Sequence, residues 1–204
     1  MSRRQLRRHR IRYDRPLRLS HHEALACPTS RSVAALFPAN AEWCEGLDHA
    51  GRDGLPYEVH LVDFGKGDQR TPEYLSLNPY GKIPAIIDPV GPGGKPLPLF
   101  ESGAILLYLA EKTGKFMPAD PAARYETVQW LFFQIAAMGP MFGQVGFFHK
   151  FAGREIEDKR PLHRYRDEAK RVLAVVDARL SERAWIRATT TPSPTFRCLA
   201  GCAI

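Results

Sequence analysis

The chain has 204 residues, 44% of them hydrophobic and 25% charged, which is the composition of a soluble globular protein with one or two domains. No apolar run is expected to be long enough to span a membrane. The formal net charge of +7 is concentrated in the Arg-rich first 53 residues, where no recognition motif or interleaved aromatic pattern accompanies it, so nucleic acid is not the expected partner.

All four cysteines, Cys27, Cys44, Cys198 and Cys202, lie outside residues 54–187. Cys198 and Cys202 form neither a C-x-x-C redox pair nor a metal-ligand set with histidine partners, so no metal site is predicted. This use of cysteine fits a reducing cytoplasm. The basic N-terminus has no apolar segment behind it and is therefore not predicted to be a secretory signal.

The first ordered elements are expected well inside the chain. Residues 1–53 show no hydrophobic period that persists and are predicted to be irregular. Order is expected to begin abruptly at Gly54. Residues 57–62 alternate well enough for a strand, and a short helix is predicted from Thr71 to about Asn78.

A β-hairpin followed by a helix is predicted next. Residues 85–88 and 97–100 are short apolar runs, and residues 90–95 between them are rich in glycine and proline. Ser102 then stands where a helix N-cap is expected, and apolar residues with helical spacing continue until Gly114 stops them. The unit is therefore strand, turn, strand, helix.

Two features of this unit suggest ligand binding. Pro84 stands at the start of a strand, and a cis bond between Ile83 and Pro84 would leave the Ile83 backbone free to pair with an extended peptide. Glu101 and Ser102 place a carboxylate and a hydroxyl at a helix N-terminus, which attracts an anion such as an α-carboxylate, while the acid beside it can hold an α-ammonium group. The ordinary alternatives are a trans edge proline and a simple helix cap.

Beyond a linker at 116–121 the chain is predicted to be helical. Residues 125–137 are apolar almost all round, which is typical of a buried helix. The helix is expected to kink at Pro140. A second helix is predicted from Pro161 to Leu180, with one apolar stripe and basic residues opposite.

Two motifs carry a family resemblance. N-P-Y-G-K-I-P-A at 78–85 and F-E-S-G-A-I-L-L-Y-L-A-E-K at 100–112 resemble the second half of the thioredoxin-like domain of glutathione S-transferases. The resemblance runs from Gly54 to about Ile186. It is greatest to the bacterial, nu-class-like group related to the disulfide-bond reductases and to the yeast prion nitrogen regulator.

The resemblance implies an α/β domain followed by an all-α domain. Residues 54–116 would form a thioredoxin-like, glutathione-binding domain that is incomplete, because its first strand and helix are missing from the predicted elements. Residues 121–187 would form a truncated helical domain on the substrate side, and residues 188–204 an irregular tail. The family also implies a homodimer, which the apolar helix at 125–137 favours.

The resemblance further implies glutathione as co-substrate. Ile83 would pair with its cysteinyl backbone beside the cis Pro84, and Glu101 and Ser102 would hold its γ-glutamyl end. Lys82 is a weaker candidate for a glutathione carboxylate, since such a lysine is commonly just solvated. On the substrate side the resemblance points to four residues of the second domain, for which core packing or a surface imidazole is the ordinary alternative: Gln144, Phe147, Phe148 and His149.

The function implied is a glutathione-dependent transferase or disulfide reductase. Hydrogen-bond donors would stabilise the glutathione thiolate and so raise the fraction of nucleophile at neutral pH. In this group the donors belong to a T-P-N-G turn after the first strand, and this sequence contains no such string. The chain is thus expected to be impaired as an enzyme, and the alternative is a non-catalytic binding or regulatory relative.

A reading-frame hypothesis accounts for the abrupt boundaries. Read one base later, codons for residues 34–41 and 42–52 can encode Q-L-Y-S-L-P-T-P and N-G-V-K-V-S-I-M-L-E-E, which restores the turn. Read one base earlier, codons for residues 188–196 can encode G-D-D-Y-T-I-A-D-I, which contains a capping box. Both chain ends would then be frameshifted, non-native sequence, and the product inactive for want of a central strand.

Overall fold

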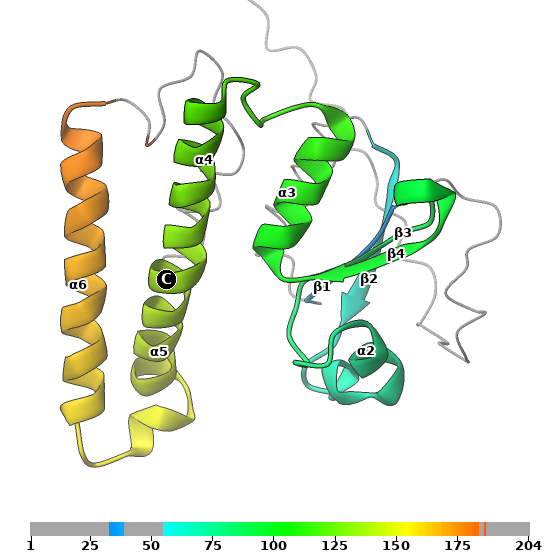
Figure 1. Cartoon of the computed structure of the whole chain (residues 1–204). Coiled ribbons are helices and arrows are strands. Elements are labelled where there is room, and N and C mark those ends of the chain that lie inside the picture. Colours follow the sequence, from blue (N-terminus) through cyan, green and yellow to red (C-terminus); the bar gives the residue numbers. More distant parts are fainter. Residues whose placement is uncertain (1–32, 39–54, 184–185, 187–204) are drawn as a thin grey trace, which may run out of the picture.

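The computed structural model describes residues 33–38, 55–183 and 186. A four-stranded sheet with helices α2 and α3 forms one part, and helices α4, α5 and α6 form the other (Figure 1). Helix α3 lies between the sheet and the long α4–α5 helix. This agrees with the predicted architecture, a thioredoxin-like domain followed by a helical domain.

The sheet contains β1 (Val33–Pro38), β2 (Tyr57–Val62), β3 (Ala85–Asp88) and β4 (Leu97–Phe100) in the order β2-β1-β3-β4. Strand β1 runs parallel to β2 and antiparallel to β3, which pairs antiparallel with β4. The predicted strands and hairpin are confirmed, with a short 3-10 turn, Pro92–Gly94, joining β3 to β4.

The prediction that the chain lacks its first strand is wrong. Val33–Pro38 forms that strand, and it lies in the centre of the sheet. The segment V-A-A-L-F-P is apolar throughout and shows no alternation, so a search for period two passes over it. The expected first helix falls within residues 39–54, and the predicted irregular tail within 187–204, both outside the described residues.

Helix α2 (Pro72–Leu77) packs on one face of the sheet and α3 (Ser102–Thr113) on the other. Successive residues of β3 point to opposite faces, so Ala85 and Ile87 join the α2 side while Ile86 joins the α3 side. All four β3 residues are buried. Strand β3 is therefore packed into two small cores, one on each face of the sheet. This packing also sets the position of the segments that adjoin its two ends.

Helix α3 begins one residue earlier than predicted. Glu101, not Ser102, is the N-cap residue, and Ser102 is the first helical residue. Glu101 has φ 69° and ψ 113°, a positive φ that is uncommon outside glycine. Sequence reasoning favoured Ser102 because serine is a preferred cap, whereas the Glu101 side chain makes no capping hydrogen bond here.

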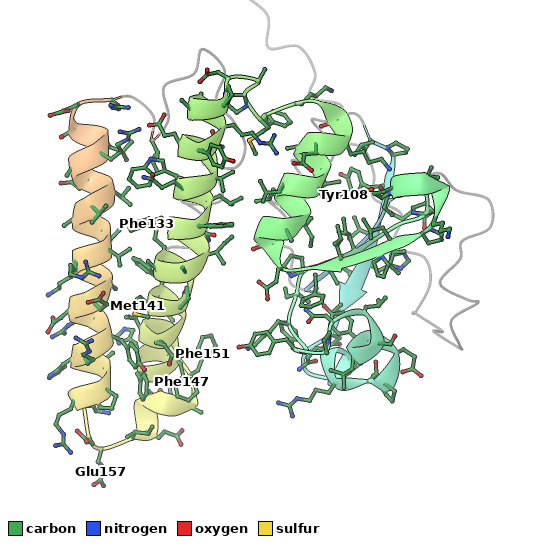
Figure 2. All side chains as sticks on the ribbon, viewed as in Figure 1. Tyr108, Phe133, Met141, Phe147, Phe151 and Glu157 are labelled. Atoms are coloured by element: carbon green, nitrogen blue, oxygen red, sulfur yellow. The ribbon has the colours of Figure 1, made fainter. Side chains whose placement is uncertain are left out.

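The helical part consists of α4 (Pro121–Phe133), α5 (Gly139–Lys150) and α6 (Arg160–Ser181), with a 3-10 turn, Ala152–Glu155, after α5. The predicted linker is confirmed between α3 and α4. Asp120 caps α4, accepting a hydrogen bond from the Ala123 N–H at 2.8 Å. Phe133 and Met141 pack with the core between the helices and point toward α6 (Figure 2).

The kink predicted at Pro140 takes the form of a π-helical turn, Gln134–Met138, directly before it. Pro140 lacks an N–H and its ring crowds the preceding turn, so an extra residue inserted there relieves the clash. Gly139 donates to the Gln134 carbonyl across this wide turn. The chain therefore runs as one helix from Pro121 to Lys150.

This long helix is not buried all round, which corrects the prediction for residues 125–137. Tyr125 is 73% exposed and Phe132 56% exposed. They belong to a set of exposed residues at helical spacing along one face, here named the α4–α5 stripe: Ala122, Tyr125, Gln129, Phe132, Ala136, Pro140, Gly143 and Phe147. The opposite face carries Trp130 and Met138, which are buried against α6.

The same helix corrects the expectation that no segment has the length for a membrane span. Residues 127–148 contain no Asp, Glu, Lys or Arg. By length and composition alone, Pro121–Lys150 is a helix that can cross a membrane. The sequence reasoning missed it because glutamines, glycines and a proline interrupt the apolar run.

Candidate functional site

The Ile83–Pro84 peptide bond is cis, as predicted. Strand β3 begins only at Ala85, so Ile83 lies just outside the ladder that joins β3 to its neighbours. Among the residues that the structure describes, the Ile83 backbone makes no hydrogen bond to another backbone group. Its peptide groups are thus placed to pair with an extended ligand.

The hairpin register brings the two predicted motifs together. Ala85 of β3 pairs with Phe100 of β4, so Pro84, which precedes Ala85, and Glu101, which follows Phe100, lie at the same end of this strand pair. Pro84 and Glu101 are 17 positions apart in the sequence, but the antiparallel pairing of β3 and β4 places them next to each other. The Ile83–Pro84 backbone and the N-terminus of α3 therefore belong to one candidate site.

The N-terminus of α3 offers donors to an anion. The first backbone hydrogen bond of the helix runs from the Ile105 N–H to the Glu101 carbonyl at 3.0 Å. The amides of the first turn have no partner within a helix, and the Glu101 side chain does not cap them. Ser102 is exposed and adds a hydroxyl, while the exposed Glu101 carboxylate supplies a negative charge beside it.

Lys82 is exposed, and its ammonium lies over the Tyr80 ring at 5.7 Å from the centroid. This cation–π contact holds the lysine along the turn before Ile83 rather than leaving it fully solvated. The lysine is therefore near the site. Its assignment to a glutathione carboxylate stays a prediction.

Gln69 is a polar residue that sequence reasoning missed. Its side-chain oxygen Oε1 is buried and has no hydrogen-bond partner among the described residues. Its backbone carbonyl lies beside Gly81, where an added Cβ would be only 3.1 Å away. No local pattern marks it, because Gln69 lies in a short polar 3-10 turn, Asp68–Arg70, and its backbone comes to lie beside Gly81 only through the fold.

The four predicted substrate-side residues lie on the C-terminal half of α5, in the other part of the molecule. Gln144, Phe147 and His149 are exposed, whereas Phe148 is half-buried and stacks on Tyr165 of α6, with ring centroids 5.7 Å apart. Phe148 thus packs α5 on α6, which is the ordinary alternative for it.

Phe147 has a second role in packing. Its ring lies against Gly153 so closely that a Cβ there would be 2.7 Å away. Phe147 and Phe151 both lie at the C-terminal end of α5 (Figure 2). The substrate role of the exposed Gln144, Phe147 and His149 remains a prediction. Among residues 33–38, 55–183 and 186, no group of three or more His, Cys, Asp or Glu side chains can hold a metal ion.

Comparison with known proteins places this geometry in a family. The sequence profile of the glutathione S-transferase N-terminal domain matches residues 47–111. A solved structure of a glutathione transferase family member from Pseudomonas fluorescens Pf-5, with two glutathione bound, is 48% identical and superimposes with a TM-score of 0.81, covering 88% of this chain and 79% of the other. The chain belongs to the glutathione S-transferase family.

Two further proteins are similar to this member of the glutathione S-transferase family. The disulfide-bond oxidoreductase YfcG of Escherichia coli is 47% identical over 133 residues, which cover 65% of this chain and 61% of that protein. A glutathione transferase from Pseudomonas putida, with one glutathione disulfide bound per subunit, is 47% identical with a TM-score of 0.79 and covers 88% and 77% of the two chains. The match thus spans about three fifths of the length of YfcG.

Proposed function

We propose that the chain binds glutathione and uses it as a transferase or a disulfide reductase. The observation that carries the proposal is the pairing of Ala85 with Phe100, which joins the Ile83–Pro84 backbone and the α3 N-terminus into one site. Solved family members with glutathione or glutathione disulfide bound support the ligand class. The names of relatives support both reaction classes, disulfide-bond oxidoreductase and glutathione S-transferase.

Each residue has a defined part in this proposal. Ile83 donates and accepts backbone hydrogen bonds with the cysteinyl unit, and Pro84 keeps this backbone outside the ladder. The first-turn amides of α3 and the Ser102 hydroxyl donate to the γ-glutamyl carboxylate, while Glu101 accepts from its ammonium. Gln69 supplies an amide next to the turn that leads to Ile83, and Lys82 is positioned to bind the second carboxylate of glutathione.

The chemistry requires the glutathione thiol to lose its proton. Donors near the sulfur lower the thiol pKa. The thiolate then attacks an electrophilic carbon and displaces its leaving group, or attacks a disulfide sulfur, which breaks the S–S bond and releases the other sulfur as a thiolate. Gln144, Phe147 and His149 are proposed to face the second substrate. We propose that the reaction takes place in a reducing cytoplasm.

A second candidate is a non-catalytic glutathione-binding protein. The absence of T-P-N-G from the sequence favours it, because this turn supplies the thiol-activating donors in the resembling group. Glutathione-affinity retention, followed by a conjugation assay and a disulfide-reduction assay, separates the candidates. Retention with turnover supports the enzyme, retention without turnover supports the binding protein, and no retention contradicts both.

We also propose a homodimer built through the α4–α5 stripe. Phe132 and Phe147 flank the small Ala136, Pro140 and Gly143, so another helix can approach this section of the stripe closely. The stripe is apolar except for Gln129, and it continues along the whole helix from Ala122 to Phe147. A second copy is the proposed occupant, since an apolar face of this length is seldom left in water.

A further inference from the structure

Two buried side chains of the α2 region converge on one backbone oxygen. The Lys82 carbonyl accepts a hydrogen bond from the Tyr74 hydroxyl at 2.7 Å and another from the Asn78 amide Nδ2 at 2.6 Å. Tyr74 and Asn78 are each only 2% exposed. Both lone pairs of this carbonyl are therefore used, one residue before Ile83.

Asn78 also fixes the rest of the turn that leads to Ile83. Its side-chain oxygen accepts from the Tyr80 N–H at 3.0 Å, and its backbone carbonyl accepts from the Gly81 N–H at 2.9 Å. Gly81 has φ +64°, which favours glycine, and its α-carbon lies beside the Gln69 carbonyl. Hydrogen bonds therefore fix the direction of the Tyr80 and Gly81 N–H groups and of the Lys82 carbonyl.

The planarity of the peptide bond carries this restraint to Ile83. The Lys82 carbonyl and the Ile83 N–H belong to one peptide plane, and the bond between these residues is trans, so the two groups point in opposite directions. With the carbonyl held toward Tyr74 and Asn78, the Ile83 N–H points away from them. Hydrogen bonds to the carbonyl also polarise the amide and make its N–H a stronger donor.

We propose that Tyr74 and Asn78 are positioning residues that aim the Ile83 N–H at the cysteinyl carbonyl of a bound γ-glutamyl-cysteinyl peptide. The inference rests on the proposed function, because glutathione is the ligand that defines the target. Neither side chain contacts the ligand; both act through the Lys82–Ile83 peptide. Burial raises the pKa of Tyr74 to about 12, so its hydroxyl remains a donor throughout the neutral range.

The test compares two Tyr→Phe variants of the full chain. Tyr74→Phe removes the hydroxyl that holds Lys82. The matched control, Tyr108→Phe, removes a hydroxyl that donates to Asp88 at 2.5 Å, on the α3 side of the sheet. Two quantities are measured in each: the amide proton shift of Ile83 in the ligand-free protein by NMR, and the Kd for glutathione by calorimetry.

Tyr74→Phe is expected to move the Ile83 amide proton upfield and to raise the Kd about fivefold, the equivalent of one neutral hydrogen bond. Tyr108→Phe is expected to leave both values unchanged even though it lowers thermal stability. Where the protein turns over, the KM for glutathione rises in Tyr74→Phe while kcat at saturation does not change, because binding alone is affected.

Asn78→Asp provides an independent variant. It keeps an acceptor for the Tyr80 N–H but places a carboxylate oxygen against the Lys82 carbonyl, so the Kd is expected to rise about tenfold. An Ile83 amide shift that does not move in either Tyr74→Phe or Asn78→Asp overturns the inference. A wild-type chain that does not bind glutathione overturns the proposed function instead, and the ligand-free NMR shift still decides whether the Ile83 amide is positioned.

Discussion

Gly103, the second residue of α3, lies directly against Ile135 in the π-helical turn. A methyl group added to Gly103 would overlap Ile135 Cδ1, so the Ile135 side chain would have to shift. Gly103 follows Ser102, so the helical part of the molecule packs against the N-terminal end of α3. The π-helical turn therefore does more than accommodate Pro140: it also sets the position at which Ile135 contacts Gly103, next to Ser102.

Gly103→Ala is expected to destabilise the protein by about 1–3 kcal/mol through overpacking. Ile135→Val removes Cδ1 and leaves Cγ1, which is 3.4 Å from the added methyl group, so the double variant is expected to recover most of the loss. Chemical denaturation of both single variants and the double variant gives the coupling energy. Additive losses would contradict direct contact between the two sites.

Ser102→Ala is expected to weaken glutathione binding by about 1.5–3 kcal/mol, because it removes a hydrogen bond to a charged group. Ser181→Ala is the control: its hydroxyl donates to the Ala178 carbonyl at 2.9 Å on α6, far along the chain from the site. Calorimetric titration with glutathione compares the two. Equal affinities in both variants would remove Ser102 from the site.

Asp88 gives a prediction about acid stability. Burial alone would raise its pKa, but hydrogen bonds from Lys112, Tyr108 and the Val90 N–H together lower the pKa below its usual value. Since the folded pKa is lower than the unfolded one, this stabilisation is complete above about pH 5 and is lost as the pH falls below about 4.

Asp88→Asn is expected to reduce stability at pH 7 by about 1–3 kcal/mol, since Lys112 loses its ionic partner. Because the variant has no carboxylate to protonate at this position, it is also expected to lose less stability than the wild type as the pH falls. The control is Asp158→Asn, because Asp158 also forms an ion pair, with Arg160, but is exposed, so this substitution is expected to lower stability far less than Asp88→Asn does. Thermal unfolding from pH 3 to pH 7 measures both. Parallel pH profiles for wild type and Asp88→Asn would contradict the prediction.

Phe132→Asp is expected to convert the proposed dimer into a monomer, because it puts a charge in the middle of the α4–α5 stripe. Phe64→Asp is the control, since Phe64 is also exposed but lies in a loop after β2. Sedimentation at micromolar concentration measures both variants. A wild-type protein that is already monomeric refutes the dimer, and dissociation by both variants refutes the assignment to the stripe.

The reading-frame hypothesis is tested by resequencing the gene. It predicts a single-base insertion or deletion near codon 53 and another near codon 187. Strand β1 occupies Val33–Pro38, which overlaps the codons that encode Q-L-Y-S-L in the alternative frame. Since this strand forms from the written sequence, the expected lack of a central strand no longer supports the hypothesis. An intact frame at both codons rejects it and raises the non-catalytic candidate to first place.

Local signals predicted part of this structure well. The hairpin and α3 were predicted from short apolar runs and turn formers, and Pro84 with Glu101 indicated the candidate site from the sequence alone. Strand β1 was missed because its sequence, V-A-A-L-F-P, is apolar throughout and shows no alternation. Gln69 and Tyr74 were missed for a different reason: their roles come from contacts across the chain that no spacing encodes.

The burial of α4 could not be predicted from its composition. An apolar helix has the same sequence whether its faces meet its own domain or another molecule, so Tyr125 and Phe132 gave no sign of their exposure. Only the placement of α6 on one side of the helix distinguishes the two faces.

The backbone of Glu101 carries a further consequence. Its φ of 69° is a conformation that glycine adopts without penalty and that costs other residues about 1–3 kcal/mol. A glycine at this position would therefore make the fold more robust while removing the carboxylate. Selection for thermostability thus favours glycine at this position, whereas selection for the proposed ligand recognition favours glutamate. A laboratory screen for heat resistance alone is therefore expected to replace Glu101 with glycine.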